Sequence, residues 1–183
     1  MQSTTDNTLM QSVQSGNIQQ MDTLYRRYKQ VVFGYLYGIH RDYDLAQDLL
    51  QTVFFRVMKY SHTFQLDSNF RHWLFRIAKN VSKDHFLKNR QASMDAIGDW
   101  SEKLVAQQQT ERELLQRESK QLLQQALKHL DHPQREVLVL SKLKGMKYAD
   151  IADILQCSEG AVKLKVFRAL KALRKVYVTL ENR

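Results

Sequence analysis

The chain has 183 residues, of which 43% are hydrophobic and 26% are charged, a composition typical of a folded globular protein. Its formal net charge of +9 favours an anionic partner. The single cysteine, Cys157, excludes an intrachain disulfide framework. No apolar run approaches the roughly 20 residues that a membrane-spanning helix needs. Because the N-terminus, MQSTTDNTLMQS, also lacks the basic and apolar regions of a signal peptide, we expect a cytoplasmic protein without membrane insertion.

Helical spacing of apolar residues recurs along most of the chain, whereas alternating strand patterns bounded by turn residues are missing. The sequence therefore predicts an all-α fold with two small helical domains joined by a linker. We place the domains at residues 1–90 and 119–183. The linker is placed at 91–118, where acidic residues replace basic ones and the apolar period fades.

In the N-terminal domain, apolar residues on one helical face predict helices over 21–39, 45–60 and 70–88. Asp44 lies where an N-cap would accept the free amides of the second helix. The segment SHTFQLDSN combines small and cap-forming residues without a period, which predicts a loop before the third helix. The helical spacing of Trp73 predicts burial in the core.

The C-terminal domain is predicted to contain four helices. A leucine stripe over 122–130 forms the first, and an Asp-His-Pro start containing Pro133 begins the second. Gly145 ends that helix, because glycine tolerates the left-handed conformation found after helix ends. A short helix over 148–155 and a long one beginning near Ser158 complete the domain.

The last helix carries a row of basic residues between 163 and 175, with no acidic residue among them. Its apolar face, from Val162 to Tyr177, is needed to pack against the helices before it. Two helices joined by a turn of about three or four residues, with the second basic and facing outward, describe a DNA-binding helix-turn-helix. A helix lying on an anionic membrane is the alternative, but the exposed aromatic and leucine face of a membrane binder is missing. The basic residues are Lys163, Lys165, Arg168, Lys171, Arg174 and Lys175.

Two separate segments resemble one protein family. The first is AQDLLQTVFFRVMKY followed by FRHWLFRIAKNVSKDHF, and the second is LDHPQREVLVLSKLKGMKYADIADILQCSEGAVKLKVFRALKALRK. Both are similar to the extracytoplasmic-function (ECF) group of bacterial RNA polymerase sigma factors of the sigma-70 family, and they occur in that family's order. The resemblance implies a non-enzymatic protein that binds core RNA polymerase, recognises promoter DNA and directs transcription initiation.

The resemblance also implies three sets of contact residues. The DLLQ helix would meet the clamp helices of the largest polymerase subunit through Asp48, Gln51, Thr52 and Phe55. The minus-ten element would be held by an aromatic and basic stretch, in which aromatic rings stack on bases and cations hold phosphates. Its members are Phe64, Asn69, Arg71, Trp73, Arg76, Lys79, Asn80 and Lys83. For Trp73, burial in the core and contact with DNA are given equal weight. The minus-thirty-five element would be read by Ser158, Glu159, Gly160, Lys163, Leu164, Lys165, Phe167, Arg168 and Lys171.

The last helix departs from the family's common pattern. Gln156 stands where a glycine commonly opens the turn, and Ala161, Leu164 and Phe167 replace commonly polar positions. Leu164 and Phe167 are candidates for contacts with thymine methyl groups or with a regulator. The family's promoter preference is therefore not carried over to this sequence.

Two other classes of function compete with this one. A conventional helix-turn-helix regulator of duplex DNA would explain residues 120–178, but it gives no reason for the aromatic and basic stretch at 64–90. The third class is a pure interaction protein. No cofactor or metal site is predicted, because His129 and His132 straddle a helix break without an accompanying cysteine or carboxylate cluster. Many members of the family are held inactive by a membrane-bound anti-sigma factor, which the resemblance adds as a candidate partner.

Overall fold

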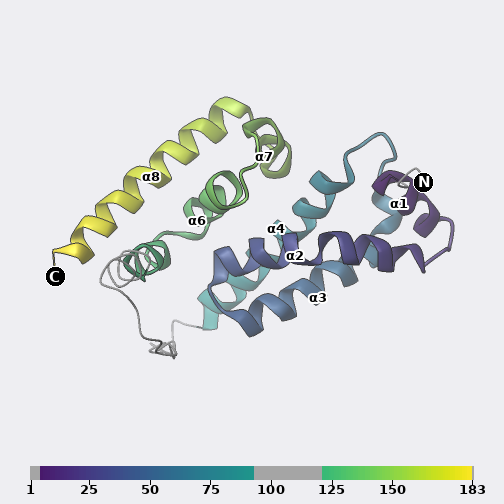
Figure 1. The fold of residues 1–183 in the computed structure, drawn as a ribbon, viewed down its shortest axis with the longest axis horizontal. Helices are drawn as coiled ribbons and strands as arrows, with labels where there is room; N and C mark the ends of the chain where they lie inside the picture. The colour runs from purple at the N-terminus through teal and green to yellow at the C-terminus, as the bar shows by residue number, and fades with distance from the viewer. Residues whose placement is uncertain (1–4, 93–120, 183) are drawn as a thin grey trace, which may run out of the picture.

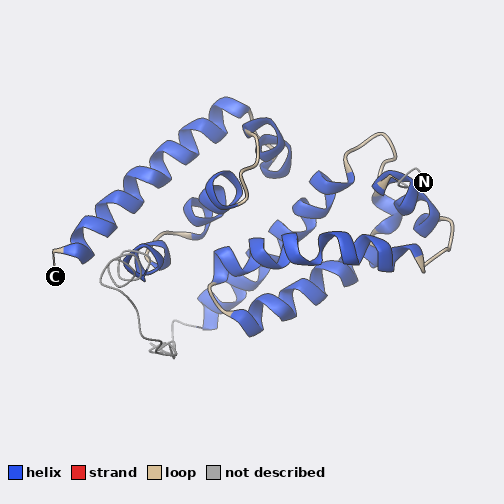
Figure 2. Cartoon of the chain, viewed as in Figure 1, coloured by secondary structure: helices blue, strands red, loops and turns tan. Residues whose placement is uncertain are grey.

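The computed structural model describes residues 5–92 and 121–182, and helices and loops make up all of this described chain (Figure 2). The all-α prediction is confirmed. The N-terminal half contains α1 (Asp6–Gln14), α2 (Gln20–His40), α3 (Tyr43–Lys59), the short 3-10 turn η1 (Ser61–Thr63) and α4 (Phe70–Ala92). The C-terminal half contains a helix that ends at residue 128, then α6 (His132–Leu138), the π-helical turn η2 (Val139–Leu143), α7 (Tyr148–Leu155) and α8 (Glu159–Glu181). The predicted linker falls almost entirely outside the described residues.

Helix α1 is an element that the sequence analysis missed. Its N-cap is Thr5, and it buries only Leu9, Met10 and Val13. Three apolar residues among the nine of this helix are too few to give a clear helical period. The helix forms because its short apolar stripe packs against α2.

The start of α3 differs from the prediction by two residues. The carboxylate of Asp42 accepts a hydrogen bond of 2.9 Å from the backbone amide of Leu45, so Asp42 is the N-cap. Asp44 instead lies in the first turn, where a negative charge still favours the helix dipole. The starts and ends in the C-terminal half follow the prediction: Asp131 caps α6, and Gly145 has a φ of +60° just after η2.

The two halves lie side by side (Figure 1). Helix α7 packs against α4, and η2 packs against α2. Their buried apolar residues form one continuous cluster. The largest fully buried side chains include Tyr35, Phe70 and Phe75 from the N-terminal half and Leu140 and Ile151 from the C-terminal half. Burying each such side chain contributes about 1.5–3 kcal/mol. Within the described part of the chain, no helix is long and apolar enough to cross a bilayer.

Candidate polymerase and nucleic-acid interfaces

The outer face of α3 carries an exposed apolar and acidic stripe. Asp48, Gln51 and Phe55 are all exposed, and their spacing of three or four residues puts them on one side of the helix. Phe55 is 65% exposed, so its apolar ring is accessible at the surface. Thr52 is half-buried, and its hydroxyl donates to the carbonyl of Asp48 at 2.9 Å. Three of the four predicted polymerase contacts are therefore free on one surface.

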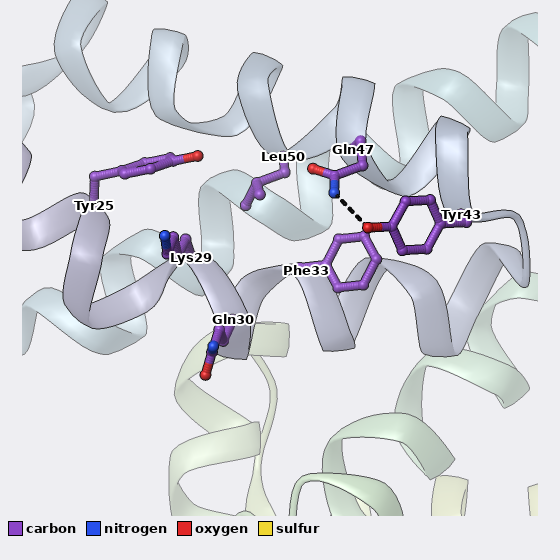
Figure 3. Close-up of a pocket in the computed structure, with 7 residues that line it drawn as sticks. All are labelled: Tyr25, Lys29, Gln30, Phe33, Tyr43, Gln47 and Leu50. Carbon is purple, nitrogen blue, oxygen red and sulfur yellow. Dashed lines mark hydrogen bonds between the residues drawn. The ribbon is translucent and has the colours of Figure 1, made fainter.

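A shallow cavity of about 270 Å³ lies beside this stripe, in the groove between α2 and α3 (Figure 3). Phe33 and Tyr43 meet edge to face there, with ring centroids 5.2 Å apart, and Gln47 donates a hydrogen bond of 3.1 Å to the Tyr43 hydroxyl. Gln47 lies one helical turn before Gln51, so the groove continues the exposed face of α3. Sequence analysis missed this aromatic groove. The one available signal was that Gln47 lies one helical turn before the predicted contact residue Gln51 and so shares its side of α3.

The predicted base-stacking aromatics form a cluster of their own. Phe64 contacts Phe70 and Trp73 with ring centroids 5.8 and 5.4 Å apart. Phe64 is only 4% exposed, so its ring is part of the core and is not free to stack on a base, contrary to the role expected for it. Trp73 is half-buried, which leaves part of its side chain at the surface.

The loop between η1 and α4 is held in place by side chains of α1. The amide of Asn7 donates to the carbonyls of Leu66 and Ser68 at 2.9 and 2.8 Å. The amide of Gln14 donates to the carbonyls of Ser61 and Phe64 at 2.9 and 2.8 Å. The bonds to Leu66, Ser68 and Phe64 give loop carbonyls a partner, and the carbonyl of Ser61 also accepts from the backbone amide of Phe64 at 3.0 Å. Sequence analysis missed Asn7 and Gln14, because contacts across some 50 to 60 residues leave no local signal.

The remaining minus-ten candidates lie along α4. The Asn69 side chain accepts from the backbone amide of His72 at 3.2 Å and so caps this helix, while remaining exposed. Its polar group is thus engaged in the helix start. Among the others, Arg71, Asn80 and Lys83 are exposed, whereas Arg76 and Lys79 are half-buried.

The recognition helix α8 is set by a tight turn. Gln156 adopts the left-handed conformation, with φ 54° and ψ 52°, in the position where a glycine is common. Ser158 caps α8 by accepting from the amide of Ala161 at 3.2 Å, so three residues separate α7 from α8. This geometry is that of a helix-turn-helix.

Helix α8 buries one narrow face and leaves its basic side free. Val162, Val166 and Ala169 are buried. Leu170, which we expected on the same face, is 39% exposed, because it lies at the edge of the buried stripe. Every predicted minus-thirty-five contact residue is exposed. Leu164 and Phe167 are 47% and 65% exposed, so these apolar side chains are free to meet a ligand.

Comparison with known families agrees with this arrangement. Residues 24–92 match the family described as Sigma-70 region 2, and residues 120–173 match the family described as Sigma-70, region 4. The first match covers most of α2, all of α3 and all of α4, and the second ends inside α8. The two matches therefore coincide with the two halves of the described structure.

Characterised relatives align over most of the chain. The ECF RNA polymerase sigma factor SigX of Bacillus subtilis is 33% identical over 83% of this chain and 80% of its own length. The RNA polymerase sigma-H factor of Pseudomonas aeruginosa is 30% identical over 93% of this chain and 92% of its own length.

Solved structures share the fold. The structure of CnrH in complex with the cytosolic domain of CnrY matches with a TM-score of 0.68 and 25% identity, over 95% of this chain and 97% of that one. The sigma factor RpoE from Bartonella quintana, solved in complex with the anti-sigma factor NepR, matches with a TM-score of 0.66 and 24% identity over 85% of this chain and 94% of that one. With its two matching regions, its two helical halves and its exposed recognition helix, the chain belongs to the ECF group of RNA polymerase sigma factors of the sigma-70 family.

Proposed function

We propose that three separate surfaces of this sigma factor act together in initiation. The outer face of α3 docks on the clamp helices of core polymerase, α4 holds the opened minus-ten element, and α8 reads the minus-thirty-five element. The observation that carries the proposal is the separation of these surfaces. Phe55 and Asp48 on α3 are exposed independently of the basic side chains of α8, such as Arg168, so one chain is able to bind protein and DNA at once.

The α3 surface suits a helical partner. Phe55 supplies an apolar anchor, and Asp48 adds a negative charge almost two turns before it. The groove lined by Phe33, Tyr43 and Gln47 widens the same surface toward α2 (Figure 3). A conventional regulator of duplex DNA gives no reason for this second exposed surface, which favours the sigma factor over that alternative.

The α8 surface suits the major groove. Lys163, Lys165 and Arg168 are exposed on a helix whose width fits that groove, and each phosphate they neutralise releases counterions. Glu159 in the first turn of α8 is placed to accept from a cytosine amino group. Leu164 and Phe167 contribute apolar contacts with thymine methyl groups. We propose that Glu159, Leu164 and Phe167 set the promoter preference together with these cations.

The α4 surface suits an unstacked strand. The accessible part of Trp73 offers a stacking platform, and Arg71, Asn80 and Lys83 offer polar and cationic contacts to the backbone. We propose that the chain itself forms and breaks no covalent bond, acts in the cytoplasm with polymerase, and is controlled by an anti-sigma factor. Two similar structures, of CnrH and of the Bartonella quintana RpoE, are complexes with CnrY and with the anti-sigma factor NepR, which supports the last point.

The proposal is tested by reconstituting initiation with core polymerase and a promoter found by sequencing transcripts that depend on this chain. We expect Asp48→Arg to weaken polymerase binding without changing DNA contacts, and Arg168→Glu to weaken minus-thirty-five binding without changing polymerase binding. Lys142→Glu is the matched control for the second change, because Lys142 is an exposed lysine in η2, outside the recognition helix. A chain that neither binds core polymerase nor supports initiation contradicts the proposal.

A further inference from the structure

Helix α1 lies beside the segment of residues 61–69, which leads into α4 (Figure 1). Asn7 and Gln14 are seven positions apart on α1, so both side chains project from one face of the helix. Each side-chain amide donates to two backbone carbonyls of the segment. A carboxamide has two N–H donors, so each side chain uses its full donor capacity on this segment.

Helix α1 is itself fixed to α2 and, through α2, to the start of α4. The carboxylate of Asp6 accepts a hydrogen bond from the Tyr28 hydroxyl and forms an ion pair of 2.6 Å with Arg27. Burial, together with the bond to Asp6, raises the pKa of Tyr28 well above its ordinary value, so the phenol remains a donor. The ring of Tyr28 meets that of Phe70, the first residue of α4, edge to face with centroids 5.4 Å apart. The bonds from α1 therefore hold the 61–69 segment in a defined position relative to α4.

The 61–69 segment also forms a turn closed by its own bonds. The backbone amide and the hydroxyl of Ser68 both donate to the carbonyl of Gln65, at 3.0 and 2.6 Å. Phe64 is buried in the core, whereas residues 65–67 are exposed. Trp73, whose ring meets that of Phe64 with centroids 5.4 Å apart, is partly accessible. The exposed turn and the accessible part of Trp73 together form the surface that is open to an unstacked base.

Order in this turn matters for binding because residues 64–69 belong to no helix. A chain segment without regular backbone bonds samples many conformations, and ordering it when a ligand binds costs free energy. The four bonds from α1 impose this order in the folded chain before DNA arrives. Helix α1 precedes residues 24–92, which match Sigma-70 region 2, so this support comes from outside the matched region.

We propose that α1 pre-forms the surface that captures an unstacked base of the minus-ten element, with Asn7 and Gln14 as its positioning residues. The proposal rests on the proposed function, which assigns α4 and its surroundings to that element. Both side chains act through the backbone that they hold in place. Polymerase carrying this chain therefore binds an opened promoter more tightly than polymerase carrying a chain in which the 61–69 segment is unrestrained. This gain requires the captured base to be present.

The test measures the affinity of polymerase carrying the full-length chain for a promoter bubble opened over the minus-ten element. Abasic sites placed one at a time in the non-template strand identify the captured base, because its removal weakens wild-type binding most. Gln14→Met removes the donors while keeping the length of the side chain, and Gln11→Met on the exposed side of α1 is its matched control. Asn7→Asp keeps the shape but removes the donors, and Gln11→Glu controls for its added charge.

We expect Gln14→Met and Asn7→Asp each to weaken binding to the intact bubble by roughly three- to tenfold, as the loss of one or two hydrogen bonds would. On the bubble that lacks the captured base, both variants should bind within about twofold of the wild type, because the coupling between α1 and the base is gone. The two Gln11 variants should match the wild type on both bubbles. Hydrogen exchange of the free chain should be faster over residues 61–69 in Gln14→Met than in the wild type.

Three outcomes overturn the proposal: an equal loss of affinity on both bubbles, which would reduce α1 to a support of the fold, unchanged binding of both variants to the intact bubble, or unchanged hydrogen exchange over residues 61–69. Failure of the proposed function is seen separately. If the wild-type chain does not bind core polymerase, or if no base of the minus-ten element affects its binding, the assignment of the DNA surface fails. Hydrogen exchange, which needs no polymerase, still decides whether α1 orders the segment.

Discussion

The hydroxyl of Tyr35 donates a hydrogen bond of 2.7 Å to Glu136, a residue 101 positions away in the chain and in the other half of the protein. Burial raises the pKa of Tyr35 well above its ordinary value, so the phenol remains a donor. Burial also raises the pKa of Glu136, against the opposing effects of the Tyr35 hydrogen bond and of Lys79. The hydrogen bond therefore links the two halves, and it forms only in a docking geometry that brings these two side chains together.

We expect Tyr35→Phe to lower the free energy of unfolding by about 1–3 kcal/mol, because the variant leaves the buried Glu136 carboxyl without its partner. Denaturant unfolding followed by circular dichroism measures the change. Tyr37→Phe is the control, since Tyr37 is half-buried on the same helix and stacks on Phe33. Equal stability of the two variants would show that the Tyr35 bond does not hold the halves together.

Acidification should weaken the wild-type chain more than a His132→Asn variant. Burial lowers the pKa of His132 to about 4 from an ordinary value of 6.5, with Arg135 and Lys83 acting in the same direction and Asp131 against them. The unfolded chain thus binds the proton more readily than the folded chain. The stability contributed by neutral His132 is complete above pH 6.5 and is lost as the pH falls toward 4.

The measurement is the difference in unfolding free energy between wild type and His132→Asn at a series of pH values. Comparing the two chains removes the effects of groups whose surroundings both retain, such as Glu136, whose raised pKa favours the folded chain at low pH. His40 adds to the difference, because burial lowers its pKa to about 4 and His132 acts in the same direction. If the difference in unfolding free energy stays constant between pH 7 and pH 4.5, the lowered pKa of His132 does not contribute to the acid sensitivity of the chain.

Asn7→Ala should reduce initiation several-fold without changing polymerase binding. The variant removes both hydrogen bonds from α1 to the loop carbonyls of Leu66 and Ser68, and a loop with fewer bonds holds an unstacked base less firmly. Initiation at saturating polymerase is the measurement. Gln11→Ala on the exposed side of α1 is the matched control, and initiation should remain at the wild-type level there.

Phe55→Ala should weaken the binding of core polymerase by about tenfold or more, because an exposed aromatic anchor is removed from the centre of the proposed interface. Its thermal unfolding should stay at the wild-type temperature, since 65% of the side chain is exposed. Ile18→Ala, which truncates a similarly exposed apolar residue before α2, is the control. An unchanged polymerase affinity would remove Phe55 from the docking surface.

Gln156→Gly should stabilise the chain by about 0.5–1 kcal/mol, because the left-handed conformation at this position costs a residue with a side chain more than it costs glycine. The opposite change is expected for Gln125→Gly, which puts glycine inside a described helix and should destabilise by a similar amount. Thermal unfolding of both variants checks the sign. A destabilised Gln156→Gly chain would mean that the glutamine side chain contributes a contact of its own.

The sequence by itself determined most of the local structure of this protein. Helical periodicity located α2, α3, α4 and the helix-turn-helix, because apolar spacing along a helix is a local pattern. The row of basic residues in α8 could be recognised for the same reason, and each predicted contact residue of this helix is exposed in the structure. Local patterns were weaker at boundaries: the N-cap of α3 proved to be Asp42, and α1 had too few apolar residues to be recognised.

Only the tertiary structure decided which of the predicted residues are free and what joins the two halves. Phe64 and Trp73 were both predicted to stack on bases, yet packing buries the first ring and leaves part of the second at the surface. The partners of Tyr35, Ser82 and His72 lie 101, 50 and 78 positions away, so no periodicity could reveal them. Their meeting depends on where whole helices dock, which is set by the summed burial of many side chains and by the space that Gly38 leaves open.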